Sequence, residues 1–273
     1  MSSGCSTSTS GPIPPPRALP EVCFTLRRKL LALLEETTDD LVLRGVQEQV
    51  RISMGVIEKA ICMYRPEELS IAYNGGKDCL VLLILLLACL PTPGSTSIPH
   101  QEPSQIPPPK SSTPPPPKTL QAIYIAPPDP FPEVEEFVSN STLQYDLDLC
   151  RYALPMRPAL EAYLAERTAV KAVFMGTRRT DPHSEFLEHF SPTDKDWPQF
   201  MRINPVIDWH YTEIWTFIRH LGVEFCCLYE RGYSSLGGVS NTRPNPALKM
   251  EGNGFRPAYE LVRDDEERLG RDR

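Results

Sequence analysis

A run of five polar or glycine residues, NGGKD at 74–78, separates a short apolar segment from a long one. Adjacent glycines let the backbone turn sharply and approach a ligand with no side chain between them. If a helix begins at Lys77 or Asp78, its free N–H groups and those of the turn form a site for phosphate. This run is not the GxxxxGK[ST] nucleotide loop, because its glycines are adjacent and Cys79 has no hydroxyl for magnesium. The pattern therefore favours a different phosphate-binding loop over the alternative, a plain strand–turn–helix corner.

Two further runs carry candidate chemistry. GTRRTDPH at 176–183 places two arginines and a carboxylate after an apolar segment, which suits a phosphate-bearing ligand and a divalent cation. A solvated loop with local Arg–Asp pairs is the alternative. In TDKDWPQFMR at 193–202, Trp197 and Phe200 could stack on an aromatic ring beside carboxylates, or could simply pack under a loop. His183 and His210 are interpreted as structural.

Apolar spacing predicts the elements that position these runs. We expect helices over 22–36, 40–64, 77–90, 131–145, 157–167, 208–221 and 258–271, and strands over 68–73, 121–126, 147–152 and 171–175; residues 192–202 are expected to be a loop. Strands that alternate with helices indicate a doubly wound α/β fold, with a mainly parallel sheet and helices on both faces. Ligands bind at the carboxyl ends of such strands, where the segments 74–78 and 176–181 fall.

Composition predicts one domain over 21–273, with a disordered tail at 1–20 and a disordered proline-rich insertion at 91–119. A domain boundary at the insertion is the weaker alternative, because the next strand completes a βαβ unit. The apolar run at 80–90 has eleven residues, whereas a membrane span needs about 20. That run is therefore expected to be a helix buried inside the domain.

Charge and cysteine content narrow the class of protein. Lysine and arginine number 28 against 35 acidic residues, a formal charge of −7, which argues against nucleic-acid binding through phosphate attraction. The eight cysteines show no CxxC or zinc spacing, so we expect reduced, buried thiols in a cytoplasmic protein; a redox pair at 226–227 is the alternative. The N-terminus has no apolar signal core, although its lack of acidic residues before Glu21 leaves a minor mitochondrial pool open. We expect a monomer whose partners are small molecules, without nucleic acid or membrane.

Six segments taken in order carry a family resemblance: YNGGKD, GTRRTDPH, TDKDWPQFMRINPVIDWHYTEIW, YERGYSSLGG, PNPALK and PAYELVRDDEERLGR. Together they resemble eukaryotic, especially fungal, FAD synthase (FMN adenylyltransferase), within the PAPS-reductase-like branch of the ATP-pyrophosphatase superfamily. The resemblance covers about 22–271 apart from the insertion. It implies an adenine nucleotide α-hydrolase-like fold with a less regular C-terminal flavin-binding region. The implied reaction is ATP + FMN → FAD + pyrophosphate with Mg²⁺.

The resemblance also implies roles for residues. The implied catalytic residues are Asn74, Asp78, Asp181, Arg268 and Arg271. The implied nucleotide- and flavin-binding residues are Tyr73, Gly75, Gly76, Lys77, Tyr124, Ile125, Gly176, Arg178, Asp194, Asp196, Trp197, Pro198 and Arg202. Asp78 and Asp181 are the candidates for Mg²⁺, and Lys77 for the β and γ phosphates. For the charged run DDEERLGRDR at 264–273, a solvated charge ladder is the alternative to a phosphate-binding role.

Two other functions stay open from sequence. A PAPS-reductase-like oxidoreductase would need a reactive C-terminal cysteine, and the last one, Cys227, lies in an apolar stretch where we expect it to be buried. A non-catalytic flavin- or nucleotide-binding protein would keep the fold without the reaction. The presence of Asn74, Asp78 and Asp181 argues against lost catalysis.

Overall fold

The computed structural model describes residues 18–91 and 119–272. Most of the expected N-terminal tail and of the proline-rich insertion lies outside these residues. The predicted N-terminal tail extends two residues too far, because Leu19 and Pro20 already belong to the first helix, α1 (Leu19–Glu35).

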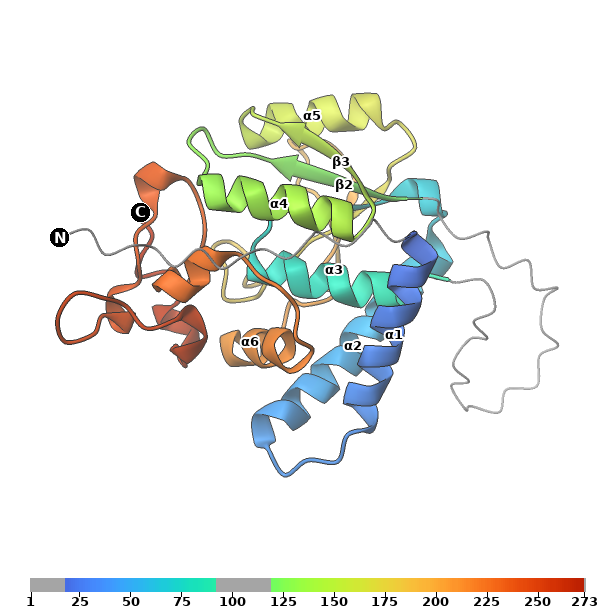
Figure 1. Cartoon of the computed structure of the whole chain (residues 1–273). Helices are drawn as coiled ribbons and strands as arrows, with labels where there is room; N and C mark the ends of the chain where they lie inside the picture. Colours follow the sequence, from blue (N-terminus) through green and yellow to red (C-terminus); the bar gives the residue numbers. More distant parts are fainter. Residues whose placement is uncertain (1–17, 92–118, 273) are drawn as a thin grey trace.

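A six-stranded sheet in the order β3-β2-β1-β4-β6-β5 forms the centre of the molecule (Figure 1). Its strands are β1 (Leu69–Ala72), β2 (Leu120–Ile125), β3 (Leu147–Tyr152), β4 (Ala172–Phe174), β5 (Phe190–Pro192) and β6 (Met201–Ile203). All neighbouring pairs are parallel except β5 with β6. The winding reverses between β1 and β4, which are hydrogen-bonded neighbours. The expected mainly parallel, doubly wound sheet is confirmed.

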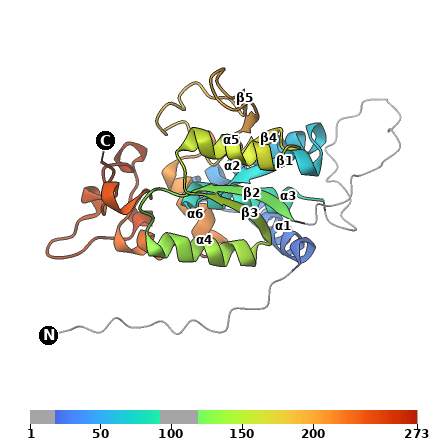
Figure 2. The same ribbon diagram turned by 90° about the horizontal axis from the view of Figure 1, so that it is seen from above.

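Helices cover both faces, but unequally (Figure 2). One face carries α3 (Lys77–Cys89), with α1, α2 (Leu41–Met63), α4 (Pro132–Gln144) and α6 (Tyr211–His220); the other carries α5 (Met156–Glu166). Side chains alternate accordingly: Ala122 and Tyr124 of β2 join the larger core, whereas Ile123 packs with Tyr163 of α5. Helix α3 contacts α1, α2 and α6, so its apolar run is buried on all sides, as expected.

Two expectations about local structure were wrong. The stretch 192–202 is not a loop throughout, because β5 and β6 form an antiparallel hairpin whose strands have only three residues each. The last segment is not a helix: it contains two short 3-10 turns, Ala258–Glu260 and Asp264–Glu266. The physical reason is that this segment has no continuous apolar stripe. Leu261 is buried and Val262 is 72% exposed, while Glu267 is only 4% exposed.

The region after α6 consists of short 3-10 turns such as Cys227–Arg231 and Pro246–Leu248, so the less regular C-terminal region is confirmed. Within the described ranges, no helix is both long and apolar enough to cross a membrane.

Candidate active site

The loop at 74–78 and the segment that begins at Gly176 meet at the carboxyl ends of the neighbouring strands β1 and β4. A methyl group on Gly176 would come within 2.7 Å of the backbone N and Cα atoms of Cys79, so only glycine lets the two segments approach this closely. Gly75 has φ +73°, a left-handed conformation that glycine adopts without strain. The meeting point is the place where the winding of the sheet reverses, which is where open α/β sheets bind ligands.

Within the loop, Asn74 and Lys77 have defined partners. The Oδ1 atom of Asn74 accepts hydrogen bonds from the backbone N–H of Gly76 (3.0 Å) and from the thiol of Cys79 (2.8 Å). The backbone N–H of Lys77 donates to the hydroxyl of Tyr229 at 2.8 Å. Two of the N–H groups expected to face a phosphate, those of Gly76 and Lys77, are therefore already satisfied by the protein.

A buried cluster of charges lies beside the loop. The ammonium of Lys77 pairs with Asp78 (2.9 Å) and with Glu267, and it lies 5.1 Å from the ring centre of Tyr211. The guanidinium of Arg178 pairs with Asp78 (2.8 Å) and with Glu267. Burial raises the pKa of Asp78, but the charges of Arg178 and Lys77 outweigh it and hold the pKa below its ordinary value. Asp78 is therefore a carboxylate at neutral pH.

Glu267 is the member of this cluster that sequence reasoning missed. Its signal was present in the run DDEERLGRDR, which we interpreted as arginines for phosphate or as a solvated charge ladder. Both expectations overlooked a buried acid, because burial of a charge depends on partners about 90 and 190 residues away in sequence. Lys77, expected on the phosphates, is 1% exposed and is held by that acid.

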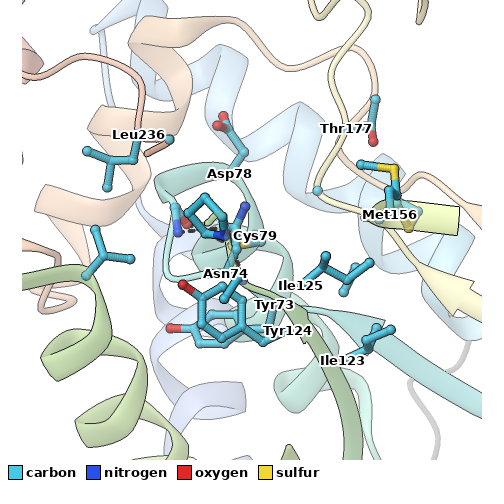
Figure 3. Close-up of a pocket in the computed structure, with 18 of the residues that line it drawn as sticks. Tyr73, Asn74, Asp78, Cys79, Ile123, Tyr124, Ile125, Met156, Thr177 and Leu236 are labelled. Atoms are coloured by element: carbon cyan, nitrogen blue, oxygen red, sulfur yellow. Dashed lines mark hydrogen bonds between the residues drawn. The ribbon is translucent and has the colours of Figure 1, made fainter. Parts of the chain in front are cut away.

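A cavity of about 630 Å³ opens over the loop and has a polar and an apolar part. Its polar lining includes Asn74, Asp78, Asp181 and Arg268. Its apolar lining includes Ile123, Ile125, Leu154, Met156, Leu160, Val173, Met175 and Phe200. In Figure 3, Ile123, Ile125 and Met156 gather on one side of Asp78, and Leu236 lies on the other. Such a cavity suits a ligand that has both phosphates and a flat apolar ring.

Strand β2 contributes to the cavity as expected, because Tyr124 and Ile125 both line it. The ring of Tyr124 is buried, and its hydroxyl donates to Glu135 at 2.7 Å. Tyr73, at the end of β1, also lines the cavity and donates its hydroxyl to Ser141 at 2.8 Å.

The expected flavin residues lie in and beside the β5–β6 hairpin. Asp194, Asp196, Trp197 and Pro198 occupy its turn, which the backbone pairing of Thr193 with Phe200 closes. None of these four residues is in the cavity lining, whereas Phe200 is. Arg202 also lies outside the lining, with its guanidinium on the carbonyl oxygen of Pro192 (2.8 Å). In this structure Phe200 is therefore the hairpin residue that reaches the site.

The two C-terminal arginines occupy different places. Arg268 lines the cavity, with its guanidinium 3.7 Å from Asp181. Arg271 is outside the lining; its Nη1 donates to the carbonyl oxygen of Leu236 at 2.7 Å, and its guanidinium fills the space where a side chain on Gly237 would go. Arg271 therefore contacts two residues of the lining, Leu236 and Gly237, from outside the cavity.

The carboxylates that line the cavity are the candidates to hold the expected magnesium. Among the described residues, no group of three or more His, Cys, Asp or Glu side chains could hold a metal by itself. Asp78 and Asp181 nevertheless both line the cavity, and each is partly exposed there (side chains 22% and 28%). Mg²⁺ usually binds through one or two carboxylates together with substrate phosphates, so the pair fits a site that the substrate completes.

The fold and the loop define a nucleotide-binding α/β protein. The family model of the phosphoadenosine phosphosulfate reductase domain matches residues 150–244. The chain is 41% identical over 227 residues to a probable FAD synthase of Schizosaccharomyces pombe, a match that covers 83% of this chain and 80% of that protein. It is 30% identical over 242 residues to the flavin adenine dinucleotide synthase of Saccharomyces cerevisiae, covering 85% and 76%.

Among solved structures, it is similar to Candida glabrata FMN adenylyltransferase in complex with FAD and inorganic pyrophosphate. The TM-score is 0.82 at 25% identity, over 95% of this chain and 99% of that one. The chain belongs to the FAD synthase family.

Proposed function

We propose that this protein transfers the adenylyl group of ATP to FMN, giving FAD and pyrophosphate with Mg²⁺. The observation that carries the proposal is the single cavity in which a phosphate loop and an apolar part meet at the reversal point of the sheet. Membership of the FAD synthase family supports it, as does the likeness to an FMN adenylyltransferase that binds FAD and pyrophosphate.

The reaction needs positioning more than covalent chemistry. An oxygen of the FMN phosphate attacks the α-phosphorus of ATP and forms a new P–O bond. The bond from that phosphorus to the oxygen bridging to the β-phosphorus breaks, and pyrophosphate leaves with the electron pair. No general base is required, because the FMN phosphate is already ionised near neutral pH.

The lining residues take roles that follow from their positions. Asn74 donates from its amide to the reacting phosphates. The glycine backbone, which has no side chains in the way, lets the β and γ phosphates approach, and the ammonium of Lys77 holds them. Arg268 neutralises charge that develops between the two substrates. Asp78 and Asp181 would hold Mg²⁺, which supplies a Lewis acid that offsets the phosphate charge.

Ring placement follows from the apolar lining. Tyr124 and Ile125 border the space for adenine. The isoalloxazine reaches Phe200 and the hairpin turn, where Asp194 and Trp197 hold its edge and plane. Ligand binding would then have to bring the turn and the cavity together, since the turn lies outside the lining.

The reductase alternative rested on the last cysteine. The expectation that Cys227 is buried was wrong: it is exposed, as is Cys62, whereas Cys226 is buried. Its sulfur accepts from Arg231 at 3.7 Å, and it is absent from the cavity lining. Its position outside the cavity gives no support to a reductase role for this chain. A monomer, a cytoplasmic location and the absence of nucleic-acid partners remain predictions.

A coupled assay tests the proposal: purified protein with FMN, MgATP and pyrophosphatase, with FAD followed by chromatography. We expect FAD and pyrophosphate in equal amounts, and none without magnesium. Binding of flavin or ATP without FAD would instead support a non-catalytic protein, and binding of neither would contradict the proposal altogether.

A further inference from the structure

Glu267 is fixed at both its side chain and its backbone. Its carboxylate oxygens are both in use, one on the ammonium of Lys77 and the other on the guanidinium of Arg178. Its carbonyl oxygen accepts from the hydroxyl of Ser234 at 2.6 Å. Glu267 is only 4% exposed, so water screens its charge little. It borders the cavity, as Lys77 does.

Glu267 belongs to a cluster of opposite charges. Lys77 and Arg178 supply two positive charges, and Asp78 and Glu267 supply two negative ones. Asp264 also approaches Arg178, at 3.4 Å, but it accepts from the backbone N–H of Tyr211 at 2.7 Å and is not in the cavity lining. Glu267 and Asp78 both join the two cations and border the cavity, but Glu267 is the more deeply buried of the two, with its side chain 6% exposed against 22% for Asp78.

We propose that Glu267 is a positioning residue that acts as the internal counter-anion of Lys77 and Arg178 and thereby limits how tightly the cavity holds pyrophosphate. The proposal rests on the proposed function, because pyrophosphate is the product that must leave. A phosphate oxygen that approaches Lys77 competes with a carboxylate already in place. Without that carboxylate the two cations would lose their most deeply buried counter-anion, and pyrophosphate would bind more tightly and leave more slowly.

The test is titration calorimetry of inorganic pyrophosphate at fixed free magnesium, together with kcat and KM. In Glu267→Gln we expect the affinity for pyrophosphate to rise about tenfold, which corresponds to about 1.4 kcal/mol. We expect kcat to fall because product release slows and Lys77 loses its fixed place. If Glu267 had a merely structural role, Glu267→Gln would have a lower melting temperature and an unchanged or weaker affinity for pyrophosphate. An unchanged affinity or a weaker one would overturn the proposal.

A second variant covers the case in which Glu267→Gln does not fold, since removing one partner of a buried ion pair is strongly destabilising. Glu267→Asp keeps the charge but withdraws the carboxylate by one methylene. We expect a smaller rise in affinity, between those of the wild type and the Gln variant, and an unchanged affinity here would also overturn the proposal.

Asp264→Asn is the matched control, because it removes another acid beside Arg178 that does not border the cavity. Its affinity for pyrophosphate should stay within about twofold of the wild type, because water screens partly exposed charges. If the wild type makes FAD and all variants bind pyrophosphate alike, the inference about Glu267 fails alone. If the wild type neither makes FAD nor binds pyrophosphate, the proposed function fails, and the role of Glu267 fails with it.

Discussion

At the scale of single residues, the orientation of the Asn74 amide is set by its neighbours. Two donors converge on Oδ1, the N–H of Gly76 and the thiol of Cys79, so the amide nitrogen is the part that is left for the cavity. Burial raises the pKa of Cys79 to about 12, so the thiol keeps its proton and stays a donor at every physiological pH. Cys79 thus orients Asn74 through this hydrogen bond.

We expect Cys79→Ala to lower kcat about five- to tenfold, the equivalent of one hydrogen bond, with a small loss of melting temperature. Cys79→Ser should restore most of kcat because a hydroxyl can also donate to Asn74. Steady-state kinetics with ATP and FMN check both variants. Cys89→Ala is the control, since that buried thiol lies at the far end of α3. Equal losses of kcat in Cys79→Ala and Cys89→Ala would contradict the orienting role.

The place of this loop between a strand and a helix was predicted correctly, because adjacent glycines between two apolar segments are typical of a tight turn. Prediction from sequence failed for Glu267, since no local pattern shows that an acid in a highly charged run will be buried. The expected flavin residues Asp194, Asp196, Trp197 and Pro198 lie outside the lining, which Phe200 reaches, and their role stays a prediction. How a hairpin turns its side chains depends on pairing that the sequence does not show.

At the scale of elements, the regular helices were predicted to within a few residues because each has an apolar stripe or an apolar core run. Strands β5 and β6 were missed because three residues are too few to show alternation. The C-terminal segment 258–271 was wrongly expected to be a helix. This segment, called the C-terminal strap below, is instead extended apart from two 3-10 turns, and its residues Glu267 and Arg268 line the cavity.

Substitutions of the two arginines in this strap should therefore have different effects. Arg268→Ala should lower kcat/KM about 100-fold at nearly unchanged melting temperature, because a partly exposed cation that faces the cavity is lost. Arg271→Ala should lower the melting temperature as well, because it removes the support of the loop at Leu236 and Gly237. Thermal denaturation and kinetics on both variants separate the two roles, and indistinguishable profiles would refute the division.

At the scale of the whole molecule, β1, α3 and β2 form one βαβ unit on which the site is built. Helix α3 ends at Cys89 and β2 begins at Leu120, and both residues are buried. The proline-rich residues between them lie outside the described part of the chain. The unit is closed by the parallel pairing of β1 with β2, whatever connects them.

Deletion of residues 92–118, bridged by a short Gly/Ser link, should therefore leave FAD formation within about twofold of the full chain, because the entropy of closing a connection depends only weakly on its length. The assay is run beside circular dichroism of both proteins. A folded deletion variant without activity would show that the insertion takes part in function.

Acid stability should depend on Glu68, which connects the start of β1 to the residue before β4. Its carboxylate pairs with Lys171 at 2.6 Å and accepts from the backbone N–H of Arg65 at 2.9 Å. The hydrogen bond from Lys171 and those from Arg65 lower the pKa of Glu68 from 4.5 to about 2. A lowered pKa means that this stabilisation is complete above about pH 4.5 and is lost as the pH falls toward 2.

The variant Glu68→Gln should consequently have a lower urea midpoint than the wild type at pH 7. The two midpoints should converge as the pH falls from about 4.5 toward 2. Parallel curves over that range would mean that the ion pairs of Glu68 contribute nothing to folding.

The distance along the chain between Lys77 and Glu267 has a consequence for biosynthesis. The two residues are 190 positions apart, so a ribosome that adds about 5 to 20 residues per second makes Glu267 roughly 10 to 40 s after Lys77. During that interval the lysine has no Glu267 to neutralise it and cannot be buried without cost. We therefore expect the phosphate loop of the nascent chain to reach its final structure only when the C-terminal strap has left the ribosome and Glu267 can pair with Lys77. We expect nucleotide binding only after that step.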